Sequence, residues 1–324
     1  MWAMVCRDWC DPDGLELDDM PEPELVAGGV RIAVRAAGLN FADTLMIKGE
    51  YQVKPPLPFS PGLEVSGDIL EVAPDVKKLQ PGDRVMAMVH YGGFAEEVVT
   101  PATDVFLIPD SMDYTAAAGF PIAYGTSHIG ICDKLKLQAG ETILIHGAAG
   151  GVGLTAVEIA KKMGATVIAT AGGPEKLAVA KQYGADHLID YRTEDIRARV
   201  KALTDGRGVE AVYDPVGGDV FTASLRATAQ QGRILVVGFA SGTVAPVPAN
   251  ILLVKNISVH GFYWGAHRIL EPGLISKSFD ELLSWYDAGE LKPHISHTFD
   301  LADASKAMEM LTSRKSTGKV VLRM

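Results

Sequence analysis

The chain contains 324 residues, of which 48% are hydrophobic, and it carries a net charge of −10. A chain of this length can form two domains, each with a core of its own. The acidic charge is spread along the sequence without a block of like charge, which argues against nucleic acid or an anionic membrane as a partner. No uncharged apolar run reaches about 18 residues, and the N-terminus lacks the pattern of a signal peptide, so we expect a cytoplasmic protein.

The three cysteines are Cys6, Cys10 and Cys132. They are too few for a disulfide framework or for a zinc site built from four thiolates. We therefore interpret them as reduced and mostly buried thiols.

The first third of the chain is predicted to be rich in β-structure. Short alternating or apolar runs are separated by pairs such as Pro61-Gly62 and Pro81-Gly82. This pattern is typical of short strands joined by tight turns, and it predicts a small twisted β-barrel. The expected strands cover residues 30–36, 65–72, 84–89 and 95–99.

From about residue 113 onward, strand-like and helical segments alternate. Six strands separated by helices predict an α/β fold with a doubly wound parallel sheet. The expected strands are 143–145, 166–170, 187–189, 211–214, 233–237 and 258–260, with helices at 153–162, 175–183, 194–204 and 221–229. Beyond them we expect helices at 276–288 and 302–312 and a closing strand at 319–322.

The segment 142–162 has the pattern of a strand, a glycine turn and a helix, with Gly147, Gly150, Gly151 and Gly153 in the turn. Glycines let the backbone approach a ligand, and the new helix offers unpaired N–H groups and the positive end of its dipole. A pyrophosphate suits these properties, and the next strand and helix complete a βαβ unit. The spacing is G-x-x-G-x-x-G rather than G-x-G-x-x-G, so a turn that only packs the helix on the sheet is the alternative.

The end of the second strand of this unit indicates which dinucleotide binds. NAD-selective sites place an acidic side chain about 20 residues after the glycines, to bind the ribose 2′-hydroxyl. Here the strand ends in Thr170-Ala-Gly-Gly173, and the first charged residues are Glu175 and Lys176. A small uncharged strand end leaves room for a 2′-phosphate, to which Lys176 can supply a positive charge. NADPH is the expected cofactor, although Lys176 as a solvated helix residue is an equally weighted alternative.

Five ordered segments, spread over nearly the whole chain, resemble those of a known superfamily. They are 37–44 (AGLNFADT), 61–67 (PGLEVSG), 82–85 (GDRV), 146–153 (HGAAGGVG) and 213–218 (YDPVGG). Together they resemble the medium-chain dehydrogenase/reductase superfamily, and within it the quinone oxidoreductase branch of zeta-crystallin-like proteins. The resemblance implies a GroES-like β-rich barrel domain at 1–120 and 266–324 and a Rossmann NADPH-binding domain at 121–265.

Zinc-dependent alcohol dehydrogenases of this superfamily carry a Gly-His-Glu triplet whose histidine binds the catalytic metal. The matching triplet here is Gly62-Leu63-Glu64, and leucine has no donor atom for zinc. There is also no cysteine near Asn40, where such enzymes place another ligand, and no four-cysteine zinc loop. We therefore expect no metal site and a substrate that accepts hydride without a Lewis acid, such as a quinone or an α,β-unsaturated carbonyl.

The resemblance also implies roles for individual residues. Asn40 matches a contact to the nicotinamide ribose, and Thr126 matches a residue that faces the nicotinamide. Backbone N–H groups of three residues in the turn are expected to bind the pyrophosphate: Gly150, Gly151 and Val152. The expected group around the adenosine 2′-phosphate comprises Gly172, Lys176 and Tyr191. The expected floor and wall of the nicotinamide pocket comprise Phe239, Phe262 and Trp264.

Several of these roles have competing interpretations. Each of the three aromatic residues can simply pack in a core, and Asn40 can act as a turn or cap residue. Tyr51 follows Asn40 on the expected cleft side, and it is the candidate catalytic proton donor for an enone, by location only. A quinone needs no such donor, because water can protonate the reduced anion.

Three functions remain open at this stage. The first is an NADPH-dependent quinone reductase, and the second is a reductase of enones or enoyl thioesters. The third is a protein that binds NADPH without catalysis. The apolar run 252–261 suggests a strand at the edge of the nucleotide-binding sheet, where pairing of two copies would form a homodimer. Alternatively, a C-terminal helix of the same chain covers that edge.

Overall fold

The computed structural model describes residues 1–324, and these form two compact units. The first unit comprises residues 1–122 and 283–324, and the second comprises residues 123–282. The sequence predicts that the chain returns to the first domain at residue 266, whereas in the structure it returns to the first unit at residue 283. Residues 266–282 group with the second unit because helix α10 (Pro272–Asp287) buries Phe279 there against Trp264, with the rings edge to face at 6.4 Å. None of the helices is both long and apolar enough to cross a membrane.

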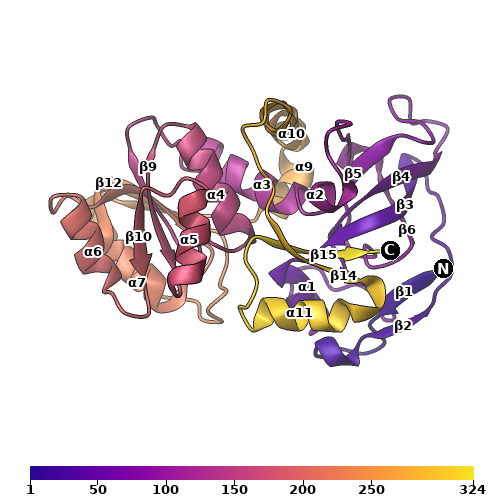
Figure 1. The fold of residues 1–324 in the computed structure, drawn as a ribbon, viewed down its shortest axis with the longest axis horizontal. Helices are drawn as coiled ribbons and strands as arrows, with labels where there is room; N and C mark the ends of the chain where they lie inside the picture. The colour runs from indigo at the N-terminus through magenta and orange to yellow at the C-terminus, as the bar shows by residue number, and fades with distance from the viewer. The chain divides into compact units, whose positions relative to one another are not determined.

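The first unit is built on a seven-stranded sheet (Figure 1). Its order is β14 (Ile295–Asp300), β15 (Lys319–Arg323), β3 (Gly29–Gly38), β4 (Glu64–Val72), β5 (Arg84–Met88) and β7 (Val105–Leu107), with β6 (Glu97–Pro101) also paired to β3. A separate pair joins β1 (Trp2–Val5) to β2 (Glu16–Asp19). The helices are α1 (Phe41–Met46), α2 (Tyr114–Ala118) and α11 (Ala304–Thr312), while α3 (Pro121–His128) contains the boundary between the units.

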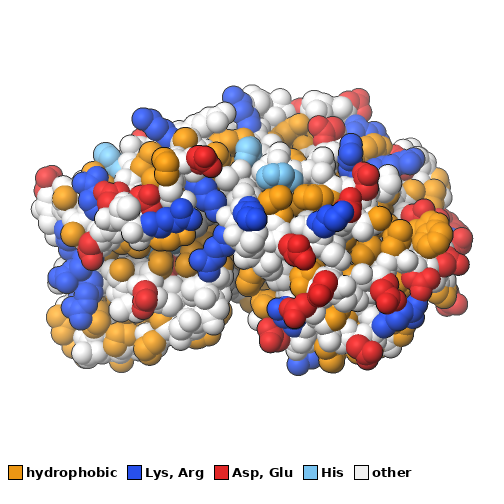
Figure 2. All heavy atoms as spheres, turned by 60° about the horizontal axis from the view of Figure 1, so that its bottom comes forward, with side chains coloured by type: hydrophobic (Ala, Val, Ile, Leu, Met, Phe, Trp, Pro, Cys, Tyr) orange, Lys and Arg blue, Asp and Glu red, His pale blue; other side chains and the backbone are white.

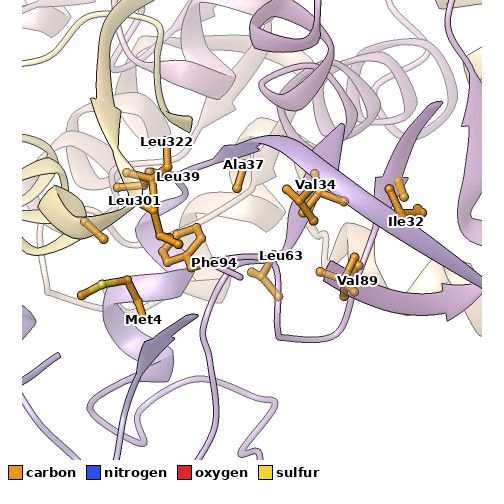
Figure 3. Close-up of a cluster of buried hydrophobic side chains, with 14 of the residues drawn as sticks. Met4, Ile32, Val34, Ala37, Leu39, Leu63, Val89, Phe94, Leu301 and Leu322 are labelled. Atoms are coloured by element: carbon orange, nitrogen blue, oxygen red, sulfur yellow. The ribbon is translucent and has the colours of Figure 1, made fainter. Parts of the chain in front are cut away.

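Strand β3 organises this sheet, because β4 pairs along its whole length on one side. On its other side β6 pairs with its first half and β15 with its second half. Alternate β3 residues such as Ile32 and Val34 are buried in an apolar cluster that also receives Leu63 (Figure 3). The four strands expected in this region are confirmed, whereas β1, β2, β7 and β14 lack a clear signal in the sequence.

The second unit contains a six-stranded parallel sheet. Its order is β10 (His187–Asp190), β9 (Thr166–Ala171), β8 (Thr142–Ile145), β11 (Val209–Asp214), β12 (Thr228–Val236) and β13 (Ser258–Gly261). The connecting helices are α4 (Gly151–Lys162), α5 (Pro174–Gln182), α6 (Ile196–Leu203), α7 (Gly218–Ala227) and α8 (Ala249–Lys255), and α9 (His267–Leu270) follows the last strand. This is the doubly wound order, in which the chain reverses direction across the sheet between β8 and β11. The predicted α/β class is confirmed.

Residues 252–255 correct the predicted edge strand. They belong to helix α8, and only residues 258–261 of the apolar run form the edge strand β13. The prediction of one strand rests on the apolar character of the run, but short apolar runs do not distinguish a helix from a strand. Asn256 separates the two elements with a left-handed backbone, at φ 51°.

Candidate cofactor-binding site

The glycine turn follows β8, next to the point where the strand order reverses. In doubly wound sheets this is the place where a crevice forms outside the carboxyl ends of the strands. Gly147 has a φ of +57°, which favours glycine. A Cβ on Gly153 would lie 2.1 Å from the carbonyl oxygen of Gly147, so only glycine lets α4 begin this close to the turn.

The N-terminus of α4 is suited to an anion. Gly150 occupies the N-cap position and caps the helix with no side chain, while Gly151 and Val152 are partly exposed in the first turn. Such a first turn offers N–H groups and the positive end of the helix dipole to a ligand. The three residues expected at the pyrophosphate therefore lie together in one turn, and their backbone fits that group.

A buried network of hydroxyl groups supports this turn from helix α3. The Ser127 Oγ lies 2.8 Å from the Val152 carbonyl oxygen and 2.8 Å from the Thr155 Oγ1. It also lies 3.0 Å from the Tyr213 hydroxyl at the end of β11. These bonds join α3, α4 and β11 beneath the first turn of α4. The sequence analysis did not single out Ser127, because its partners lie far along the chain.

The end of β9 forms a second part of the site. A Cβ on Gly172 would lie 2.7 Å from the Tyr191 hydroxyl oxygen and 2.8 Å from the Arg192 Nε, so both side chains pack against this glycine. Gly173 has a φ of +94°, and a Cβ there would lie 3.2 Å from an Arg192 guanidinium nitrogen. Lys176 is half-buried in the first turn of α5. The structure thus places Gly172, Tyr191 and Lys176 around the two ends of adjacent strands.

Arg192 was missed by the sequence analysis. Strands β9 and β10 run parallel, with Asp190 aligned to Ala171, so residues just after Asp190 lie beside the glycine pair. The Asp190 carboxylate accepts hydrogen bonds from the N–H groups of Gly173 and Arg192, which ties the two strand ends together. Arg192 is exposed and adds a guanidinium that can bind a phosphate with two donors. In the sequence, the only indication of its role is that it directly follows Tyr191, which was already expected near the 2′-phosphate.

The aromatic residues divide into one exposed and two buried side chains. Phe239 is 42% exposed in the segment after β12. Phe262 is buried and packs against the ring of His267 at 5.6 Å, and Trp264 is buried against Phe279. A Cβ on Gly125 would lie 2.5 Å from the Trp264 ring, so the indole is in close contact with α3. Phe262 and Trp264 thus pack inside the second unit, beside the helix that carries Thr126.

In the first unit, Asn40 lies at the start of α1 within a cluster of buried polar groups. The Asn40 Nδ2 donates a hydrogen bond to Glu64 Oε1 at 2.9 Å, and its Oδ1 accepts one from Lys319 Nζ at 2.7 Å. The Asn40 N–H donates to Asp43 Oδ2 at 2.7 Å, the side-chain half of a capping box. Burial raises the pKa of Asp43 to about 7, against the lowering effects of the Asn40 N–H and the Lys319 ammonium.

Tyr51 and Leu63 also lie in the first unit. Tyr51 is partly buried and packs against the apolar cluster, whereas Leu63 is 8% exposed and contributes to that cluster (Figure 3). The position that matches the zinc-binding histidine therefore holds an aliphatic side chain within an apolar core.

Charged side chains of both signs are interspersed on the face shown in Figure 2, without a continuous patch of one sign.

Two protein-family models match parts of this chain. The model of the alcohol dehydrogenase GroES-like domain family matches residues 26–110, and that of the zinc-binding dehydrogenase family matches residues 151–286. The chain is 44% identical over 322 residues to quinone oxidoreductase-like protein 2 homolog from Nematostella vectensis, covering 99% of this chain and 88% of the relative.

Two solved structures are similar over the full length of both chains. The quinone oxidoreductase of Escherichia coli complexed with NADPH is 29% identical with a TM-score of 0.93, and covers 100% of each chain. The quinone oxidoreductase of Thermus thermophilus, solved alone and with NADPH, is 35% identical with a TM-score of 0.88, again over 100% of each chain. These similarities cover both units.

Proposed function

This chain belongs to the medium-chain dehydrogenase/reductase superfamily, in the branch of quinone oxidoreductase-like proteins, and we propose that it transfers hydride from NADPH to a quinone without a metal. That it is an oxidoreductase of a fold that binds NADP(H) follows from its relatives. The choice of the quinone as acceptor is our proposal. It is supported by the names of the relatives and by Leu63, which removes the imidazole that a zinc-dependent alcohol dehydrogenase requires.

The proposal that the cofactor is NADPH rests mainly on one observation. The end of β9 has no acidic side chain, and Tyr191 and Arg192 pack against Gly172 at this end. A carboxylate at this position would bind a ribose 2′-hydroxyl and repel a 2′-phosphate. Hydroxyl and guanidinium donors at a small strand end favour the phosphate instead.

In this proposal the residues of the second unit bind and orient the cofactor. The first turn of α4 binds the pyrophosphate through the N–H groups of Gly150, Gly151 and Val152. Lys176 and Arg192 supply positive charge to the 2′-phosphate. When bound, NADPH supplies the hydride, and the protein contributes orientation and exclusion of water.

At the nicotinamide end, we assign the contacts to Thr126, Asn40 and the exposed ring of Phe239. Phe262 and Trp264 are assigned a packing role beneath the nicotinamide contacts, because both side chains are buried against neighbouring helices. A reduced quinone takes its proton from water, so no protein acid is assigned to that reaction. Tyr51 is retained as the candidate donor only for an enone, whose α-carbon must gain a proton.

We also propose that two copies pair through their β13 edges. Strand β13 ends the six-stranded sheet, and exposed edges of this kind are commonly covered by another chain. The preceding helix α8 exposes Leu253 and Val254, at 76% and 69%, which adds apolar area near that edge. Sedimentation equilibrium is the test, and a monomer at micromolar concentration would contradict the pairing.

The test of function is the oxidation of NADPH, followed by its near-ultraviolet absorbance, with a panel of acceptors. We expect turnover with benzoquinones or naphthoquinones, and a much lower rate when NADH replaces NADPH. Turnover of enones or enoyl thioesters without quinones would assign the protein to alkene reduction. Tight NADPH binding with no turnover of any acceptor would favour a non-catalytic role.

A further inference from the structure

Lys319 on β15 is a buried lysine with all three of its donors engaged. It is 6% exposed, and its Nζ lies 2.5 Å from the Leu39 carbonyl oxygen, 2.7 Å from Asn40 Oδ1 and 2.7 Å from Glu64 Oε1. Lysines are almost never this buried unless they are paired. Leu39 and Asn40 are consecutive residues between β3 and α1, while Glu64 begins β4 and Lys319 begins β15.

Glu64 is the second member of this cluster, and it is completely buried. Its Oε1 accepts from Lys319 and from Asn40 Nδ2, and its Oε2 accepts from the Ile122 N–H at 2.8 Å. A Cβ on Gly38 would lie 2.6 Å from Glu64 Oε1, so the carboxylate is closely packed as well. Neither oxygen of the carboxylate lacks a partner.

The chemistry of this pair determines how the Asn40 amide is oriented. A lysine ammonium only donates hydrogen bonds, and an ionised carboxylate only accepts them. Asn40 therefore must turn its Oδ1 towards Lys319 and its Nδ2 towards Glu64, because the flipped amide would place donor against donor and acceptor against acceptor. The Asn40 Nδ2 also donates a long hydrogen bond to the Gly38 carbonyl oxygen, at 3.4 Å.

The energetics of buried ion pairs suggest that Lys319 and Glu64 orient the Asn40 amide rather than stabilise the fold. Burying two charges carries a large desolvation cost, and apolar replacements of buried ion pairs are often as stable or more stable. A pair that adds little stability can still fix the geometry of a neighbour. Here the neighbour is the polar side chain that the proposed function places at the nicotinamide ribose.

We propose that Lys319 and Glu64 are positioning residues that lock the Asn40 amide in the orientation that binds the nicotinamide ribose. This inference rests on the proposed NADPH-dependent function. It assigns to the last strand of the chain a part in binding the nicotinamide half of the cofactor. Neither residue touches the reacting atoms in this assignment, because both act through Asn40.

The experiment compares two ligands by titration calorimetry on the full chain. NADPH reports both halves of the site, whereas adenosine 2′,5′-bisphosphate reports only the phosphate end near Gly172. For the double variant Lys319→Met/Glu64→Gln, we expect the Kd of NADPH to rise about tenfold, the effect of losing one good hydrogen bond. The Kd of adenosine 2′,5′-bisphosphate is expected to stay unchanged. With a saturating quinone, the KM for NADPH should rise more than kcat falls.

Two further variants test that the effect passes through Asn40. Lys319→Arg keeps a charged donor and should restore NADPH binding to within about threefold. In an Asn40→Ala background, the double substitution should cause no additional loss of NADPH affinity, because residues acting through one contact are not additive. The matched control is Arg84→Met, which removes another cation of the same unit that bonds a backbone carbonyl, that of Met112 at 2.6 Å. It should leave both affinities unchanged.

The outcomes separate this inference from the proposed function. Equal NADPH affinity in the double variant and the unsubstituted chain, or parallel losses for both ligands, overturns the inference alone. An unsubstituted chain that does not bind NADPH overturns both. If the double variant does not fold, Glu64→Gln alone replaces it, since one amide oxygen cannot serve three donors. We then expect about fivefold weaker NADPH binding with unchanged bisphosphate binding, and equal NADPH binding would refute the role of Glu64.

Discussion

The close approach of α4 to the glycine turn can be tested with Gly153→Ala. The added Cβ would lie 2.1 Å from the Gly147 carbonyl oxygen and 2.7 Å from its carbon. Raising 2.1 Å to the 3.4 Å of an ordinary contact requires the two segments to separate by about 1.3 Å. Both are backbone, so no flexible side chain can move away. Overpacking of this kind costs about 1–3 kcal/mol in the free energy of unfolding.

Such a shift also moves the N–H groups that we assign to the pyrophosphate. Charge-assisted hydrogen bonds contribute about 1.5–3 kcal/mol each, so loss of one raises the Kd of NADPH at least about tenfold. We would measure the thermal midpoint by circular dichroism and the Kd by calorimetry. The control is Gly273→Ala in the first turn of α10, where an added Cβ meets nothing within 4 Å. It should keep both values or raise the midpoint, because alanine favours helices. An unchanged midpoint and Kd in Gly153→Ala would refute this account of the turn.

Three other predictions concern single side chains. Arg192→Ala should raise the Kd of NADPH about tenfold and leave that of NADH unchanged, since only NADPH carries the 2′-phosphate; equal changes for both would remove Arg192 from the site. Burial raises the pKa of Asp43 to about 7, above its value in the unfolded chain, so the folded state holds an extra proton between about pH 4 and 7. The stability that the protonated Asp43 carboxyl contributes is therefore lost as pH rises through this window, and Asp43→Asn should flatten the pH dependence of urea unfolding between about pH 4 and 7; an unaltered slope would contradict the assignment. Tyr51→Phe should lower any enone turnover about tenfold and leave quinone turnover unchanged, and stopped assays at saturating NADPH would show whether it does.

The sequence determined the features that depend on short stretches of chain. The glycine turn at residues 147–153 and the alternation of strands and helices follow from local backbone preferences and from the period of apolar residues. The uncharged end of β9 and the leucine at position 63 are also local, and each is visible without a structure. For these reasons the fold class could be predicted, and NADPH could be proposed as the cofactor.

The tertiary structure decided the contacts between residues that are distant in sequence. Lys319 and Asn40 are 279 positions apart, and no local pattern indicates that a lysine in the last strand bonds the amide at the start of α1. The place of Arg192 against Gly172 depends on the register between β9 and β10, and residues 252–255 form a helix although their apolar composition suits a strand equally well. Hydrogen-bond partners and buried charges are selected by packing in three dimensions, so sequence patterns, which report only on neighbouring residues, cannot specify them.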